Sequence, residues 1–160
     1  MADSLITPEL QATIGKRSKP RLQEVDKLQI RLFARSVGHT DPIYYDEAAA
    51  KAAGFKSLVA PPGYLGTGVF SPGGPAEGPA QQSGPQPSRP LNRILNGGTQ
   101  LEYFDTIVAG DELEAETYTS DMQEREGSIG QMLIVESKTE YKRKSDGKIV
   151  AVSTGQLIRY

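Results

Sequence analysis

The sequence predicts an α+β domain, with helices in its first half and an antiparallel sheet in its second half. Apolar residues at helical spacing are typical of the chain before residue 71, whereas alternating, β-branched and aromatic stretches follow residue 97. Both patterns lie within 160 residues, which is the size of one domain that can bury its own core. We therefore expect a single domain over residues 1–160.

An amphipathic helix is expected over residues 25–37. Its apolar residues recur at helical spacing and define one buried stripe, formed by Val25, Leu28, Leu32 and Phe33. Gly38 ends this pattern. The sequence His39-Thr40-Asp41-Pro42 then predicts a turn, because a proline disfavours the helical conformation of the residue before it.

Two further helices are expected before residue 71. Asp46 is a favourable N-cap for a short helix over residues 47–53, and Gly54 suits its C-cap. Pro61-Pro62 can occupy the first turn of a helix over residues 63–70. This last segment is small and apolar, so we expect it to cover one face of the sheet.

The segment 71–90 reads SPGGPAEGPAQQSGPQPSRP and offers almost no residue that could anchor it to a core. Such a composition is typical of a flexible insertion. Recognition of the proline-rich sequence by another protein is the functional alternative. We expect a flexible Gly/Pro-rich insertion over residues 71–90.

Four strands are expected in the second half, over residues 100–108, 112–117, 132–141 and 149–158. The segments that join them, at residues 109–111, 125–127 and 145–147, each contain a glycine in a sequence compatible with a hairpin. The sequence therefore predicts an antiparallel meander.

The composition excludes several classes of site and partner. The chain has 18 Lys and Arg against 20 Asp and Glu, without long blocks of one sign, which argues against nucleic acid and anionic membranes. The absence of cysteine excludes disulfides, zinc-thiolate sites and thiol nucleophiles. No apolar run approaches the length of a membrane span, and no metal-ligand spacing or phosphate-binding loop occurs. We expect a cytoplasmic protein without a metal or cofactor.

Three segments, LFARSVGHTDPIYYDEAAAKAAGF, KSLVAPPGYL and ILNGGTQLEYFDTIVAGDEL, together resemble the MaoC-like dehydratases. The resemblance is to the N-terminal, FAS1-like dehydratase subgroup, and covers roughly residues 14–160 apart from the Gly/Pro-rich insertion. The motifs that carry it are Phe33-Ala34, Ala60-Pro61-Pro62, Gly97-Gly98 and Ala109-Gly110-Asp111. The resemblance implies a hot-dog fold, in which a curved antiparallel sheet wraps around a central helix. It also implies pairing with a second such unit and a thioester site between the two.

The resemblance implies the addition of water to an enoyl thioester, or its reversal, by an Asp and a His in the motif Gly-Asp-x-Asn-Pro-Ile-His. In this chain Gly38 and Pro42 keep their places, while His39, Asp41 and Tyr44 stand where the family has Asp, Asn and His. His39 and Asp41 could form a rearranged acid/base pair, with Tyr44 as a hydrogen-bond donor. Alternatively, Asp41 braces the turn, His39 lies at the surface and Tyr44 packs.

Four residues are candidates for substrate binding. Gly63 and Tyr64 open the expected helix, where unsatisfied backbone N–H groups suit a thioester oxygen; otherwise Gly63 only relieves crowding after the prolines. Asn96 and Gly97 permit either a close approach of backbone to ligand or a bulge before a strand.

The expected function is that of a subunit of an (R)-specific enoyl-CoA hydratase or 3-hydroxyacyl-thioester dehydratase. The chain would shape the acyl pocket, while a partner hot-dog unit supplies the catalytic Asp and His. The substrate would be a thioester of CoA or of acyl carrier protein, and the assembly a homodimer or a heterodimer with a MaoC-like hydratase. The alternatives are a non-catalytic acyl-CoA-binding or scaffold protein and a thioesterase, although residues 62–70 contain no carboxylate to activate water.

Overall fold

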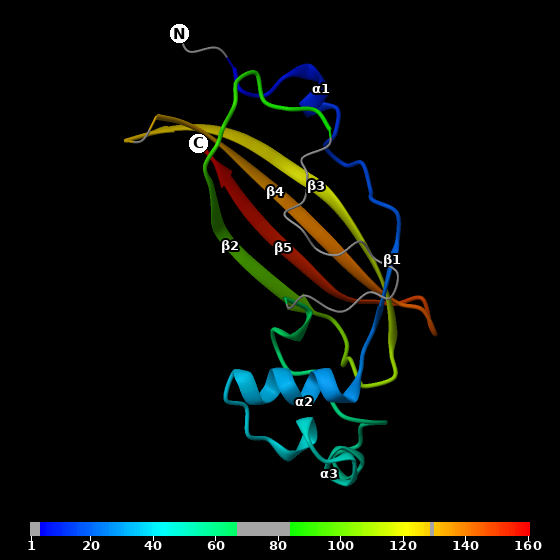
Figure 1. The fold of residues 1–160 in the computed structure, drawn as a ribbon. Coiled ribbons are helices and arrows are strands. Elements are labelled where there is room, and N and C mark those ends of the chain that lie inside the picture. The colour runs from blue at the N-terminus through cyan, green and yellow to red at the C-terminus, as the bar shows by residue number, and fades with distance from the viewer. Residues whose placement is uncertain (1–3, 67–83, 129) are drawn as a thin grey trace.

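The computed structural model describes residues 4–66, 84–128 and 130–160, and it confirms an α+β fold built on a curved antiparallel sheet (Figure 1). In the described part the sheet has five strands in the order β1-β3-β4-β5-β2. The strands are β1 (Arg21–Glu24), β2 (Ile94–Tyr103), β3 (Glu112–Gly127), β4 (Gly130–Arg143) and β5 (Ile149–Arg159). Strands β3, β4 and β5 form the expected meander, and β1 was not predicted. The joint expected at residues 125–127 was placed too early, because these residues still pair with β4 as the end of β3.

The position of β2 differs from the expected one. It ends at Tyr103 and pairs with β5, so residues 109–111 do not form the expected hairpin with β3. After Tyr103 the chain leaves the sheet, because its backbone finds partners among the segments that precede β2. The carbonyl of Ile107 accepts a hydrogen bond from Ala60 at 2.8 Å, and the amide of Ala109 donates to Leu58 at 2.8 Å.

The described helices are α1 (Pro8–Gln11), α2 (Lys27–Ser36) and α3 (Glu47–Ala52), with short 3-10 turns at Pro42–Tyr44 and Tyr64–Gly66. Helices α2 and α3 confirm the expectations over residues 25–37 and 47–53. Where a helix was expected over residues 63–70, the described part forms a 3-10 turn at Tyr64–Gly66, and residues 67–70 lie outside the described residues. No helix in the described part is both long and apolar enough to cross a membrane.

The main core lies at one end of the sheet, where α2 is next to the strands and α3 lies on the far side of α2 (Figure 1). Its fully buried side chains include Ile30 from α2, Leu58, and Leu113 from β3. The predicted stripe was partly wrong, because Leu28 and Leu32 are 61% and 57% exposed. The helix instead buries Ile30 and Ala34, which lie on the opposite side of its axis from Leu28 and Leu32.

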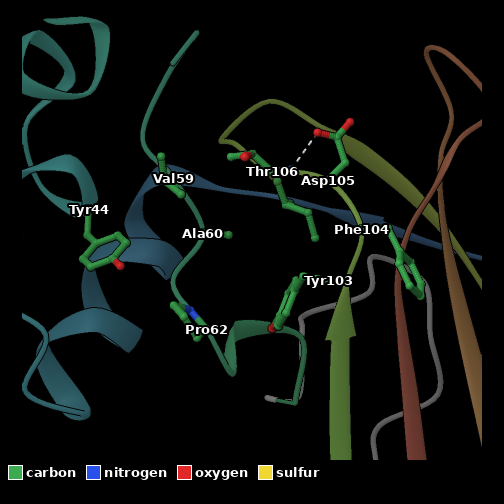
Figure 2. Close-up of a pocket in the computed structure, with 9 residues that line it drawn as sticks. Tyr44, Val59, Ala60, Pro62, Tyr103, Phe104, Asp105 and Thr106 are labelled. Atoms are coloured by element: carbon green, nitrogen blue, oxygen red, sulfur yellow. Dashed lines mark hydrogen bonds between the residues drawn. The ribbon is translucent and has the colours of Figure 1, made fainter. Parts of the chain in front are cut away.

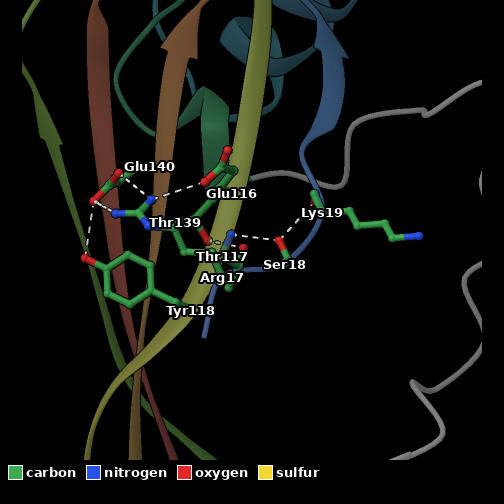
Figure 3. A network of polar contacts seen from close by, with 8 residues as sticks. All are labelled: Arg17, Ser18, Lys19, Glu116, Thr117, Tyr118, Thr139 and Glu140. Carbon is green, nitrogen blue, oxygen red and sulfur yellow. Dashed lines mark hydrogen bonds and ion pairs between the residues drawn. The ribbon is translucent and has the colours of Figure 1, made fainter. Parts of the chain in front are cut away.

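The N-terminal segment covers the outer edge of β3. The amides of Gly15 and Ser18 donate to the carbonyls of Thr119 and Thr117, each at 2.8 Å. Arg17 extends this attachment across the sheet, since its guanidinium contacts Glu140 at 2.7 Å and 3.0 Å (Figure 3). The N-terminal segment also contributes Leu5 and Leu10 to a second, smaller core, which they form with Leu91 and Leu133.

Part of the expected insertion over residues 71–90 is described, from residue 84 onward. There Pro87 is buried, and Ser88 binds the N-terminal segment through a 2.6 Å hydrogen bond from its hydroxyl to the carbonyl of Ser4. The end of the segment is therefore attached to the domain. Residues 71–83 lie outside the described residues, and the flexible insertion stays a prediction.

Candidate functional site

A cavity of about 560 Å³ lies between the helical layer and the end of β2 (Figure 2). Its walls come from the turn after α2, from the segment before the 3-10 turn at Tyr64–Gly66, and from the chain that leaves β2. The residues that line it are Tyr44, Val59, Ala60, Pro62, Tyr103, Phe104, Asp105, Thr106 and Ile107. Most of these side chains are apolar, so the cavity suits an apolar group with a few polar contacts.

Tyr103 connects the end of β2 to the turn that follows Pro61-Pro62. Its hydroxyl oxygen accepts a hydrogen bond from the amide of Gly63 at 3.0 Å. Gly63 has φ +89, and a Cβ atom placed there would lie 3.2 Å from Cζ of Phe33. Glycine is therefore required both by the backbone conformation and by the close approach of α2. The amide of Gly63, expected as a donor to the substrate, lies beside the cavity but already donates to the hydroxyl oxygen of Tyr103.

The turn after α2 is fixed mainly by backbone contacts. Gly38, with φ +76, lets the amide of His39 reach the carbonyl of Ala34 at 2.9 Å, which is the hydrogen bond of a Schellman motif. The carboxylate of Asp41 then accepts the amide of Ile43 at 3.1 Å. This geometry favours the bracing role for Asp41 and directs Tyr44 into the cavity wall.

His39 and Tyr44 lie side by side, with ring centroids 5.4 Å apart. Tyr44 lines the cavity, whereas His39 and Asp41 do not belong to its lining. The structure thus brings one of the three catalytic candidates to the cavity and places the other two in the adjoining turn. Their catalytic roles remain proposals.

Both tyrosines of the cavity are neutral hydrogen-bond donors at physiological pH. Burial raises the pKa of Tyr44 above its usual range, and the negative charge of Asp41 raises it further. Burial also raises the pKa of Tyr103, although hydrogen bonds from the backbone of Gly63 and Leu65 oppose that shift. Each phenol therefore keeps its proton.

Asp105 is the carboxylate that lines the cavity, and it is already paired. Its Oδ2 atom accepts a hydrogen bond from Arg143 at 2.9 Å, and its Oδ1 atom accepts the amide of Thr106 at 2.8 Å. The hydrogen bond from Arg143 is the main reason why the pKa of Asp105 lies below its usual range. A carboxylate held in this way is a weak base.

The remaining candidates lie away from the cavity. Tyr64 is 1% exposed and donates its hydroxyl to Oε1 of Gln29 at 3.1 Å, so it belongs to the core. Asn96 and Gly97 stand at a bulge in β2, where Asn96 accepts the amide of Gly98 at 2.9 Å. They lie roughly 20 Å along the strand from Tyr103. The geometry favours the bulge over a role in this cavity.

Most of the chain matches a known family profile. The family described as "FAS1-like, dehydratase domain region" matches residues 12–152. The chain belongs to this FAS1-like dehydratase family. The predicted resemblance is thereby confirmed.

Relatives of this FAS1-like domain include a UPF0336 protein from Parafrankia sp., which is 30% identical over 135 residues covering 84% of this chain and 83% of the relative. A second relative is a probable enoyl-CoA hydratase alpha subunit from Thermomonospora curvata. It is 25% identical over 164 residues that cover 94% of this chain and 50% of the relative. The chain thus spans about half of that second protein.

Solved structures identify the fold as a hot dog. The ChsH1-ChsH2 complex from Mycobacterium tuberculosis aligns with a TM-score of 0.70 at 20% identity, covering 94% of this chain and 92% of the other. The HadBC (3R-hydroxyacyl-ACP dehydratase) complex from the same organism gives 0.67 at 21%, covering 91% and 96%. The MaoC-like dehydratase from Rhodospirillum rubrum gives 0.65 at 22%, covering 96% and 97%.

Of the residues that line the cavity in this FAS1-like domain, sequence reasoning named Tyr44 alone as a site residue, and it missed the two with defined polar contacts, Tyr103 and Asp105. Both lie in the segment LEYFDTIV, whose composition favours one continuous strand. An Asp in the middle of a β-branched and aromatic stretch is the signal that could have indicated a break there. Among the described residues, no three His, Asp or Glu side chains come together in a way that could hold a metal ion.

Proposed function

We propose that this FAS1-like domain is the pocket-forming subunit of an (R)-specific enoyl-CoA hydratase or 3-hydroxyacyl-thioester dehydratase. In this proposal a partner hot-dog unit supplies the catalytic Asp and His. The observation that carries it is the cavity itself, which combines apolar walls and two neutral phenols with a carboxylate that is already paired. Such a cavity can bind an acyl thioester, but the described residues that line it include no free pair for proton transfer.

The reaction explains why the missing pair matters. Hydration of an enoyl thioester requires a base that activates water, an acid that protonates the α-carbon, and donors for the charge that grows on the thioester oxygen. The phenols of Tyr44 and Tyr103 can serve as donors. The base and the acid have no equivalent in the cavity lining, because Asp105 is held by Arg143 and His39 lies outside it.

Two observations support a partner subunit. The ChsH1-ChsH2 and HadBC structures are complexes, and the Thermomonospora curvata relative is named as an alpha subunit. In the described chain, β2 pairs with β5 on one side only, and its edge presents Ile94 and Leu95, which are 52% and 53% exposed. An open strand edge with apolar side chains is suited to a protein contact.

Co-expression with a MaoC-like hydratase tests this proposal. The tagged chain and the candidate partner are purified together, and hydration of crotonyl-CoA is followed by the loss of enoyl absorbance. We expect the chain alone to show little turnover and the complex to be active. Robust turnover by the chain alone contradicts the partner proposal, and a stable complex without turnover favours a scaffold.

The roles of His39 and Asp41 are tested in the same complex. If they form a rearranged acid/base pair, His39→Ala and Asp41→Ala each abolish hydration. If the catalytic pair belongs to the partner, both variants retain turnover as long as the complex forms. A complex between this chain and a partner whose own Asp and His are replaced provides the reciprocal measurement.

A further inference from the structure

The phenol oxygen of Tyr103 has a defined position. Tyr103 is the last residue of β2, and its ring extends from the sheet toward the turn at Pro62 and Gly63 (Figure 2). There its oxygen accepts the amide of Gly63 at 3.0 Å. Because this amide is part of a turn constrained by Phe33, it holds the phenol oxygen at a fixed point of the cavity wall.

This contact leaves the hydroxyl proton available. A phenol oxygen can accept hydrogen bonds and donates one proton. The phenol oxygen of Tyr103 accepts hydrogen bonds from the backbone of Gly63 and Leu65. Among residues 4–66, 84–128 and 130–160, no acceptor receives the proton of Tyr103. Donation by an amide to the oxygen also polarises the O–H bond and makes it a better donor.

The surroundings of this proton suit a carbonyl oxygen. Val59, Ala60 and Ile107 give the cavity apolar walls, against which the acyl chain of a ligand can pack. Tyr44 lies on the other side of Ala60 and Pro62 and adds a second phenol (Figure 2). A ligand in this cavity meets two phenol donors, and the negative charge of Asp105 in the lining favours an uncharged acceptor oxygen over an anionic one.

We propose that the Tyr103 hydroxyl, held by the amide of Gly63, donates a hydrogen bond to the carbonyl oxygen of the bound acyl thioester. This inference rests on the proposed function and adds to it the residue that recognises the thioester carbonyl. Tyr103 thereby selects acyl thioesters over ligands of the same shape that lack the carbonyl. Gly63 acts as a positioning residue, because its amide contacts the phenol and not the substrate.

Two ligands and two variants test this role. Binding of butyryl-CoA is compared by calorimetry with binding of S-butyl-CoA, a thioether in which a methylene replaces the carbonyl. The measurements use the full chain, together with its partner subunit when the two co-purify. The variants are Tyr103→Phe and, as a matched control, Tyr118→Phe, whose hydroxyl binds Glu140 outside the cavity.

The wild-type chain should bind the thioester about 3- to 10-fold more tightly than the thioether, which is the range of one neutral hydrogen bond. Tyr103→Phe should lose this preference by weakening thioester binding alone, and Tyr118→Phe should keep it. The role of Tyr103 is overturned if Tyr103→Phe keeps this preference, or if it weakens the binding of both ligands equally. Either result leaves the proposed function intact. Failure of the wild type to bind either ligand overturns both.

Discussion

The Nη1 atom of Arg143 lies 2.9 Å from Oδ2 of Asp105, so the end of β4 is joined to one wall of the cavity. The same guanidinium donates to the carbonyl of Thr106 at 2.6 Å and contacts Asp146 at 3.0 Å. The side chain of Arg143 is only 12% exposed. One cation thus organises the segment that leaves the sheet after Tyr103.

Replacement of Arg143 by Met should destabilise the domain. Asp105, Asp111 and Asp146 would lose their shared cation, and the carbonyl of Thr106 would lose a donor. We expect the free energy of unfolding, measured with urea, to fall by about 1–3 kcal/mol. Lys144→Met is the control, because Lys144 is 52% exposed and its pair with Glu112 should contribute less. Equal losses in the two variants would contradict this assignment.

Stability should fall in acid, and Arg143 should account for part of the fall. Hydrogen bonding to Arg143 lowers the pKa of Asp105, and the amide of Lys148 is the main cause that lowers the pKa of Asp146. A lowered carboxyl pKa stabilises the fold above the unfolded value of about 3.9, and this contribution is lost as pH falls through the folded pKa. Urea unfolding at a series of pH values should show a shallower acid decline in Arg143→Met than in the wild type. Parallel curves would exclude this linkage.

The two faces of α2 should respond differently to truncation. Ile30 is fully buried, so Ile30→Ala should lower the free energy of unfolding by about 2–5 kcal/mol. Leu28 is 61% exposed, and Leu28→Ala should change it by no more than about 0.5 kcal/mol. Chemical denaturation of both variants of the isolated chain provides the comparison. A large cost at Leu28 would mean that this face is covered.

Gly63 should not tolerate a side chain. Its φ of +89, and the 3.2 Å that would separate an added Cβ atom from the ring of Phe33, predict that Gly63→Ala lowers the free energy of unfolding by about 1–3 kcal/mol. Gly155→Ala in β5 is the matched control, because nothing lies within 4 Å of its Cβ position. Thermal unfolding of both variants tests the difference. A wild-type melting temperature in Gly63→Ala would remove the steric argument.

Features that depend on neighbouring residues could be predicted from the sequence. The N-cap at Asp46, the left-handed C-cap at Gly54 and the end of the first helix at Gly38 were correctly placed, because each depends on backbone groups within its own turn. The β3-β4-β5 meander followed from short joints for the same reason. Tyr44 entered the candidate site because it belongs to the turn motif.

Features that depend on distant partners could not be predicted. Both apolar sides of α2 are compatible with helical spacing, and only the packing of the sheet determines that Ile30 is buried and Leu32 is not. The pairing of β2 with β5 joins segments that are 48 to 65 residues apart, from Tyr103 with Ala151 to Ile94 with Arg159. Tyr103 and Asp105 become site residues only because their chain leaves the sheet to meet Gly63 and Arg143.

The two borders of the sheet are unequal. One is capped along β3 by the N-terminal segment, through β1 and the amides of Gly15 and Ser18, while the ten-residue β2 has no such cover within the described chain. Within the described chain the outer side of the four-residue β1 is a short edge and that of β2 is a long one. A strand from another chain is therefore expected to add along β2 rather than along β1.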